Sequence, residues 1–164
     1  MLPEEPRAET TEVRLEPDNP LPGGALKMWR WEAAITAFVL FAVASGIAMG
    51  VGALMPWLPL AAAAIGVAYA VVVPRARHRR WRWALHEREL DIVYGIWEVT
   101  RTIVPVTRIQ HVSVQRTAWT DTFGLVRLHV HTAAGTTTIP GLAPAQADDV
   151  RDRILARLQT PDDL

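Results

Sequence analysis

Three histidines in the second half of the chain have a spacing that could bind a metal ion. His129 and His131 are two positions apart, so on a β-strand they lie on one face, and His111 belongs to an earlier segment. Imidazole is a common ligand of transition metals. However, the pair adjoins Arg127, and no acidic residue in that segment is placed to orient an imidazole. We therefore expect histidines in contact with solvent and no metal site.

The serines and carboxylates form no arrangement that is typical of a catalytic centre. Ser45 and Ser113 lack the flanking glycines of a nucleophile elbow. Paired carboxylates such as Asp148 and Asp149 occupy polar stretches, without the apolar surroundings that acid–base catalysis needs. The chain contains no cysteine, which excludes thiol nucleophiles and disulfides. A glycine-rich phosphate loop is also absent. We expect neither an enzyme nor a cofactor.

The strongest chemical signal is a cluster of five arginines that follows 42 residues (33–74) without a charged side chain: Arg75, Arg77, Arg79, Arg80 and Arg82. Such a cluster can set the orientation of a membrane segment, bind anionic lipid, or bind nucleic acid. Next to a bilayer, acidic lipid attracts each basic residue by about 1 kcal/mol. The tryptophans around the cluster are typical of a membrane interface, which disfavours the nucleic-acid interpretation. We predict that the five arginines face the surface of the lipid bilayer.

The uncharged residues 33–74 are long enough for two membrane crossings. A helix rises about 1.5 Å per residue and the hydrocarbon core is about 30 Å thick, so one crossing needs about 20 residues. Two prolines within Met55–Pro59 indicate the turn. We predict spans at Ala33–Leu54 and Trp57–Val73, within a transmembrane hairpin of residues 29–74. A cleaved signal peptide is disfavoured, because an acidic tail precedes the first span and a second apolar run follows it.

Tryptophans and small residues give the predicted hairpin two further features. The flanking tryptophans are expected to anchor it at the membrane interfaces: Trp29, Trp31, Trp57, Trp81 and Trp83. Small residues spaced four apart are expected to let the two helices, or a second copy of the chain, pack closely: Ala42, Gly46 and Gly50, and then Ala62, Gly66 and Ala70. Neither span contains a charged side chain, which indicates an anchor rather than a transport path.

The basic residues beside the spans predict the orientation of the hairpin. Lys27 and Arg30 precede the first span and the arginine cluster follows the second, whereas the connecting turn is uncharged. Lys and Arg accumulate in the loops that stay in the cytoplasm. We predict a two-pass protein of the bacterial plasma membrane, with both termini in the cytoplasm.

Beyond the arginines, the apolar pattern alternates with a period of two, which is typical of β-strands. Strands are predicted over residues 89–94, 98–105, 108–116, 126–132 and 136–141, with Gly95 at a turn. Val126, Leu128 and Val130 share the apolar face of the clearest strand. Pro144 begins a helix with one apolar stripe, made of Ala147, Val150, Ile154 and Leu158. This helix can cover the open end of a small sheet or barrel.

Three segments occur in an order typical of one family: LDIVYGIW (90–97), VPVTRIQHVSV (104–114) and FGLVRLHVHTAAG (123–135). With the hairpin, they resemble the bacterial pleckstrin-homology-like, membrane-flanked domain family in its short, YdbS-like form, over about residues 30–158. The resemblance implies a PH-like β-barrel capped by a C-terminal helix at the inner face of a bacterial membrane. It also implies a membrane partner with repeated copies of the domain. Asp121 and Thr122 stand where the family often has a basic or polar residue, which argues against an anionic ligand at that loop.

The sequence thus predicts four parts: an acidic, disordered tail (1–28), the hairpin (29–74), a basic juxtamembrane linker (75–83) and a PH-like domain (84–160). The fold class is a two-helix transmembrane hairpin followed by a small, mainly-β PH-like barrel with a C-terminal α-helix as its cap. We expect a non-enzymatic, membrane-anchored adaptor whose cytoplasmic domain binds a partner protein, either another membrane protein or a second copy of the chain. The alternative is recognition of anionic lipid headgroups.

Overall fold

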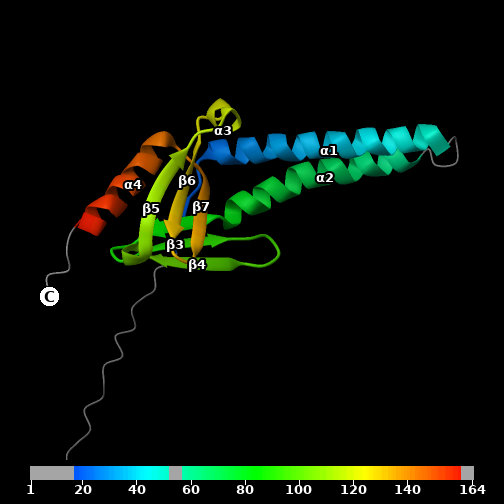
Figure 1. The fold of residues 1–164 in the computed structure, drawn as a ribbon. Coiled ribbons are helices and arrows are strands. Elements are labelled where there is room, and N and C mark those ends of the chain that lie inside the picture. Colours follow the sequence, from blue (N-terminus) through cyan, green and yellow to red (C-terminus); the bar gives the residue numbers. More distant parts are fainter. Residues whose placement is uncertain (1–16, 52–56, 160–164) are drawn as a thin grey trace, which may run out of the picture.

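The computed structural model describes residues 17–51 and 57–159. Two long helices, α1 (Gly23–Val51) and α2 (Trp57–Arg80), pack side by side and project from a mainly-β domain (Figure 1). Both are long and apolar enough to cross a membrane. Pro59 lies in the first turn of α2, where proline is tolerated. Met55 and Pro56 of the predicted turn, together with Leu54 and the first sixteen residues of the predicted tail, lie outside the described residues.

Two antiparallel sheets form the domain (Figure 1). The first has the order β1 (Asn19–Pro20), β2 (Arg82–Leu85), β3 (Glu89–Tyr94) and β4 (Thr100–Pro105). A 3-10 turn, η1 (Val106–Arg108), leads into the second sheet of β5 (Ile109–Gln115), β6 (Val126–Thr132) and β7 (Gly135–Leu142). The short helix α3 (Ala118–Thr122) precedes β6, and α4 (Pro144–Gln159) ends the described chain.

The apolar faces of both sheets and of α4 meet in one core. Val126, Leu128 and Val130 are buried, as the alternation along β6 predicts. Ala147, Val150 and Ile154 of α4 pack into the same cluster, whereas Leu158 is exposed. The predicted fold class is therefore confirmed, except that the two sheets do not close into a barrel. No pairing joins the first sheet to the second among the described strands.

The base of the hairpin belongs to this core, which changes the predicted boundaries. Leu21, Ala25 and Met28 are buried in it, so residues 17–28 are ordered rather than a disordered tail. Residues 75–83 are not a linker, because α2 continues through Pro74 to Arg80 and β2 begins at Arg82. The ring of His78 lies 3.0 Å from the carbonyl oxygen of Leu21, measured from Nε2. Helix α2 is thereby tied to the segment before α1.

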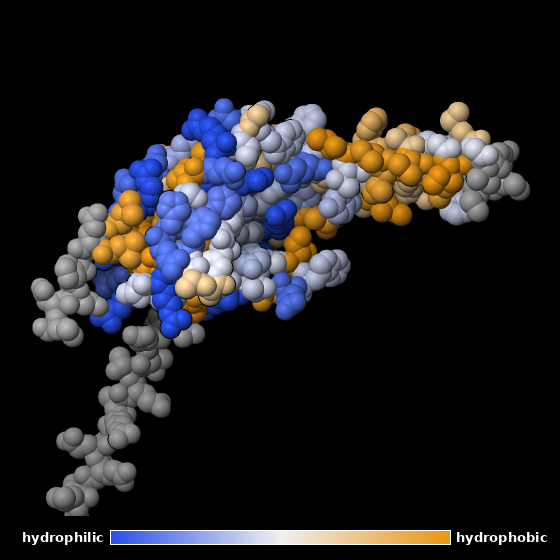
Figure 2. All heavy atoms as spheres, viewed as in Figure 1, coloured by the Kyte–Doolittle hydropathy of each residue, from blue (hydrophilic) through white to orange (hydrophobic). Residues whose placement is uncertain are grey.

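The surface of the hairpin beyond its base is apolar. Figure 2 shows hydrophobic residues over its projecting part, whereas the domain surface is mostly hydrophilic. Phe38 and Met49 of α1 and Leu60 and Ile65 of α2 are largely exposed. Such a continuous exposed apolar surface is expected of a membrane-embedded segment and not of a soluble one.

Small residues bring the two helices together, but those of α1 are not the predicted ones. Gly66 is buried, and a Cβ atom at this position would lie 2.9 Å from the Cβ of Ala37. Ala62 and Ala70 are partly buried on the same side of α2, as predicted. In contrast, the predicted α1 stripe is exposed over its whole length, at Ala42, Gly46 and Gly50. Within the hairpin, α1 contacts α2 through a face that carries Ala33, Ala37 and Ala44 instead. Packing of the exposed stripe against a second copy of the chain stays a prediction.

Candidate membrane-proximal binding site

The structure separates the five predicted arginines rather than presenting them as one surface. Four lie in the last turns of α2, where Arg75 and Arg79, four positions apart, share one face and Arg77, two positions from each, lies on the opposite face. Arg75 donates to the carbonyl oxygen of Val71, at 3.1 Å. Arg80 donates to the carbonyl oxygen of Ile96 in the β3–β4 loop. Arg82 is in β2 and donates to the carbonyl oxygen of Trp81, at 2.9 Å. The arginines of the cluster thus bind different parts of the chain: Arg75 binds α2 itself, Arg80 binds the β3–β4 loop, and Arg82 binds the residue before it.

The predicted tryptophan anchors fall into two groups. Trp31 and Trp57 are about 60% exposed on the hairpin, where they can contact lipid. The rings of Trp29, Trp81 and Trp83 are buried in the domain core, so the predicted interfacial role is wrong for these three. They are buried because the segments before α1 and after α2 join the first sheet. The composition of these segments alone does not reveal that pairing.

A pocket of about 380 Å³ lies between the hairpin base and the second sheet. Met28, Trp29 and Glu32 of α1 and Arg77 of α2 form one side. The other side comes from β6 and β7, with Arg127, His129, Thr138 and Pro140. Ligand-binding pockets commonly measure about 300–1,000 Å³, so this one can hold a small polar group. Of its three basic side chains, only Arg77 belongs to the predicted cluster.

Two guanidinium groups dominate the electrostatics of this pocket. The Cζ atom of Arg77 lies 4.3 Å from the centre of the Trp29 ring, a cation–π contact that leaves its N–H donors unused. Arg127 is half-buried, and its guanidinium group has no side-chain hydrogen bond or ion pair within residues 17–51 and 57–159. Glu32 also lines the pocket, where its charge acts on Arg77, and it accepts a hydrogen bond of 3.2 Å from Nε1 of Trp119. The arrangement favours an anion.

The histidines lie on the outer face of the second sheet, where they bond to their strand neighbours. Nδ1 of His129 is 2.8 Å from the hydroxyl of Thr138, and Nε2 is 3.1 Å from the amide oxygen of Gln115. Burial lowers the pKa of His129, and the charges of His131 and Arg127 lower it further. The ring of His129 is therefore favoured in its neutral form. In the part of the chain that the structure describes, no group of three or more His, Cys, Asp or Glu side chains is placed to hold a metal.

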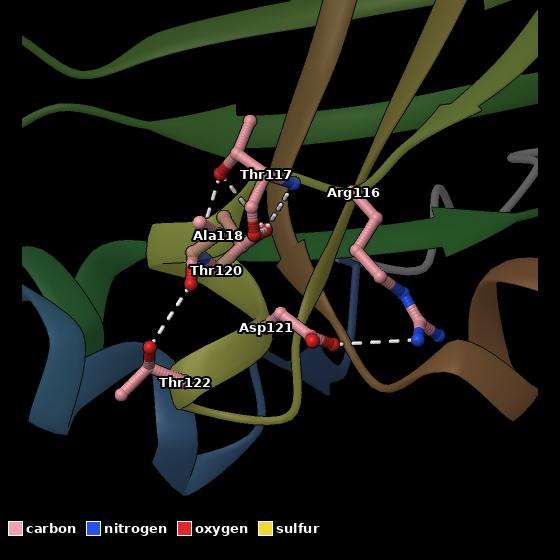
Figure 3. A network of polar contacts seen from close by, with 6 residues as sticks. All are labelled: Arg116, Thr117, Ala118, Thr120, Asp121 and Thr122. Atoms are coloured by element: carbon pink, nitrogen blue, oxygen red, sulfur yellow. Dashed lines mark hydrogen bonds and ion pairs between the residues drawn. The ribbon is translucent and has the colours of Figure 1, made fainter.

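The loop before β6 is held by its own side chains (Figure 3). The hydroxyl of Thr117 accepts from the backbone N–H of Thr120 at 3.2 Å, which caps α3. Asp121 pairs with Arg116 at 3.3 Å, and Thr122 donates to the carbonyl oxygen of Ala118 at 2.9 Å. The carboxylate of this loop is thus already neutralised by a neighbour. Arg116, the basic side chain beside this loop, is paired with Asp121, and the absence of an anion site in the loop stays a prediction.

A larger groove, of about 710 Å³, lies between the two sheets. The edge strand β4, the turn η1 and the start of β5 form one wall, with residues 102–105 and 107–110. The β6–β7 turn, residues 132–137, forms the other. Sequence analysis missed the groove, because it exists only where the two sheets fail to pair. The pocket that contains Arg77 and Arg127 was missed for a similar reason, since these two residues are 50 positions apart in the sequence.

Comparisons with known proteins agree with this architecture. Residues 34–158 match the family described as Bacterial PH domain. The chain is 30% identical over 158 residues to UPF0699 transmembrane protein YdbS of Bacillus subtilis (strain 168), covering 92% of this chain and 99% of that protein. No solved structure gives a significant match. With its two apolar helices, its two antiparallel sheets and its C-terminal helix, this membrane protein belongs to the bacterial PH domain family.

Proposed function

We propose that the protein is a non-enzymatic, membrane-anchored adaptor whose PH domain binds a partner protein at the cytoplasmic face of the plasma membrane. The groove between β4 and the β6–β7 turn carries this proposal. Strand β4 is an edge strand that pairs with β3 alone among the described strands. An extended segment of a partner can add to such an edge through backbone hydrogen bonds, while side-chain pockets give specificity.

The walls of the groove suit a peptide better than a small substrate. Ile103, Pro105 and Ala133 supply apolar contacts, and Thr136 and Gln110 supply hydrogen-bonding groups. The groove lies next to the edge of β4, which pairs only with β3 among the described strands. It holds no pair of carboxylates and no nucleophile beside a base. Binding is therefore the function that its chemistry favours.

Site-specific photo-crosslinking in the native cells tests the proposal. A photoreactive residue replaces Thr107, which is exposed in the groove wall, and in a matched control it replaces Thr122, which is exposed on α3. We expect a covalent adduct with another polypeptide at position 107 only, and mass spectrometry can then identify the partner. An absence of polypeptide adducts at position 107, or the same adducts at both positions, would refute the adaptor proposal.

A second function, recognition of an anionic lipid headgroup, is favoured by the pocket that contains Arg77 and Arg127. Glu32 lines this pocket and directly precedes the first uncharged span, so the pocket lies at the depth of the headgroups. The interfacial layer is about 5–7 Å thick on each side of the hydrocarbon core. A phosphodiester anion between the two guanidinium groups would use their free N–H donors.

Native mass spectrometry of the full chain in neutral detergent tests this function. The protein is titrated with phosphatidylglycerol and, for comparison, with phosphatidylcholine. We expect Arg127→Gln and Arg77→Gln each to weaken phosphatidylglycerol binding by about tenfold, since charged hydrogen bonds contribute about 1.5–3 kcal/mol. Arg79→Gln removes the same charge from the same helix outside the pocket, and its effect should stay within about threefold. Equal effects at Arg79 and Arg127 would indicate surface charge alone.

A further inference from the structure

The β3–β4 loop carries exposed apolar side chains that neither proposed function uses. Trp97, at the tip, is 97% exposed, and Val99 beside it is 60% exposed. A tryptophan normally buries a large part of its ring, so almost complete exposure indicates a surface that another medium or molecule covers. Trp97 is more exposed than any of the five tryptophans that sequence analysis assigned to the membrane interface.

Contacts at its base hold the loop beside the end of helix α2. Arg80, the last residue of α2, donates a hydrogen bond to the carbonyl oxygen of Ile96. The ring of Tyr94 stacks on the ring of Trp81, with 5.9 Å between the ring centres. These two contacts fix the loop to the part of the chain that leaves the membrane.

The loop also points toward the membrane. Figure 1 shows the β3–β4 loop extending in the same direction as the hairpin, beyond the domain end of α2, whereas α4 lies on the opposite side of the sheets. Pro74 is the last residue of the uncharged stretch 33–74. Arg80 lies six positions after it, which corresponds to about 9 Å along a helix. A loop that is hydrogen-bonded to Arg80 and extends toward the hairpin therefore approaches the interfacial layer, about 5–7 Å thick, that borders the hydrocarbon core.

The backbone keeps the loop in this shape without help from the core. Gly95 has φ +123°, and a Cβ atom at this position would lie 1.8 Å from the carbonyl oxygen of Glu98. Only glycine fits this turn, which holds Trp97 at the tip. The loop therefore holds the backbone of Trp97 in place, which reduces the conformational entropy that is lost on binding.

We propose that Trp97 inserts into the headgroup–acyl boundary of the leaflet next to the domain, so that the β3–β4 loop is a third membrane contact of the chain. Indole rings favour this boundary, where the ring is desolvated and its N–H still finds an acceptor. Together with the two helices, this contact fixes the tilt of the domain. Insertion is driven by the apolar ring, so it does not require acidic lipid.

Depth-dependent fluorescence quenching of the full chain in vesicles of phosphatidylcholine tests the proposal. The chain has no cysteine, so Val99→Cys provides a unique site for an environment-sensitive dye. Arg153→Cys, exposed on α4, is the matched control. With nitroxide-labelled lipid, we expect at least threefold stronger quenching at position 99 than at position 153. Equal quenching at the two positions would overturn the proposal and leave the loop free to bind a partner protein.

Replacing Trp97 itself shows whether the indole ring makes the contact. In the Val99→Cys protein, Trp97→Ser should reduce the quenching at least twofold, whereas Trp31→Ser on the hairpin should not. Since Trp97 has no core contact, the thermal midpoint should be unchanged, which shows that the domain still folds. Unchanged quenching after Trp97→Ser would overturn the proposal. High salt should not change the quenching, whereas it should weaken headgroup binding through the arginines. The insertion of Trp97 and the recognition of a headgroup can therefore be refuted independently.

Discussion

Asp91 is a fully buried acidic side chain in a small domain, and Arg101 forms an ion pair with it. Nε of Arg101 lies 3.1 and 3.0 Å from the two carboxylate oxygens of Asp91, across the β3–β4 pair. This ion pair joins β3 to β4, the two strands of the hairpin that carries Trp97. A buried ion pair adds little net stability, yet removing one partner leaves an uncompensated charge.

We expect Arg101→Met to lower the free energy of unfolding by about 3 kcal/mol, because Asp91 then remains buried without a counter-charge. The double variant Asp91→Leu with Arg101→Met should recover most of this loss, since neither charge is left. Urea unfolding of the full chain in detergent measures both. If the double variant is as unstable as the single one, packing and not charge explains the effect.

The lowered pKa of His129 predicts a loss of stability in acid. The folded protein binds fewer protons at this ring than the unfolded chain does, so the stabilisation is present above the ordinary pKa of about 6.5 and is lost as the pH falls below it. Protonation also places a charge beside Arg127 and His131. His129→Gln should therefore lose less stability than the wild type between about pH 7 and pH 5, as thermal midpoints would show. Parallel profiles would contradict this explanation.

Elements formed by local pattern were predictable, whereas elements formed by distant pairing were not. The alternation of apolar residues predicts both ends of β3, β4, β5, β6 and β7 to within about two residues. Strand β1 has only two residues, Asn19 and Pro20, which pair with Trp83 and Arg82 after the chain has passed through the whole hairpin. No local periodicity reveals such a contact. The arginines also concealed β2, because charge was a stronger signal than strand pattern.

The site shows the same limit. The sequence correctly indicated that basic residues gather where the hairpin ends, but it could not indicate that Arg77 faces Arg127 across a pocket. The position of Trp97 depends on a loop whose direction relative to the hairpin is a property of the folded chain (Figure 1). Likewise, a stripe of small residues has the same spacing on either face of a helix, so Gly46 and Gly66 could not be told apart.

Gly66 and Gly46 offer a matched test of how the two helices pack. Gly66→Val would place methyl groups into Ala37, and such overpacking costs about 1–3 kcal/mol. Gly46→Val meets no atom within 4 Å and should change the thermal midpoint in detergent little. A larger effect at Gly46 would contradict the observed pairing of the helices, and it would indicate that the exposed stripe packs against a second copy of the chain.

At the scale of the whole molecule, the hairpin returns the chain to the side from which it started. Strand β1, before α1, pairs with β2, after α2, so both flanks of the hairpin lie in one domain. We expect reporters fused to the N-terminus and after Leu164 to indicate the cytoplasm, because Lys27, Arg30 and the arginine cluster flank the spans. A reporter inserted within Met55–Pro59 should indicate the outside. An external C-terminus would contradict the predicted orientation.

The shared core also predicts that the domain cannot be separated from the hairpin at residue 84. A fragment of residues 84–160 lacks β1, half of β2 and five large buried side chains: Leu21, Met28, Trp29, Trp81 and Trp83. At about 1.5–3 kcal/mol each, their burial contributes roughly 7–15 kcal/mol, which is as large as the whole stability of a typical domain. The fragment should therefore lack the dispersed amide resonances of a folded protein.

A second soluble chain keeps the base of the hairpin and removes only the membrane part. It joins residues 17–31 to residues 76–159 through a short glycine–serine linker, which can span the gap because Arg77 contacts the ring of Trp29. This chain should fold, as dispersed amide resonances would show, since every buried side chain of the hairpin base remains. If residues 84–160 fold equally well alone, the hairpin base only rests on the domain. If neither chain folds, the membrane part is itself required for folding.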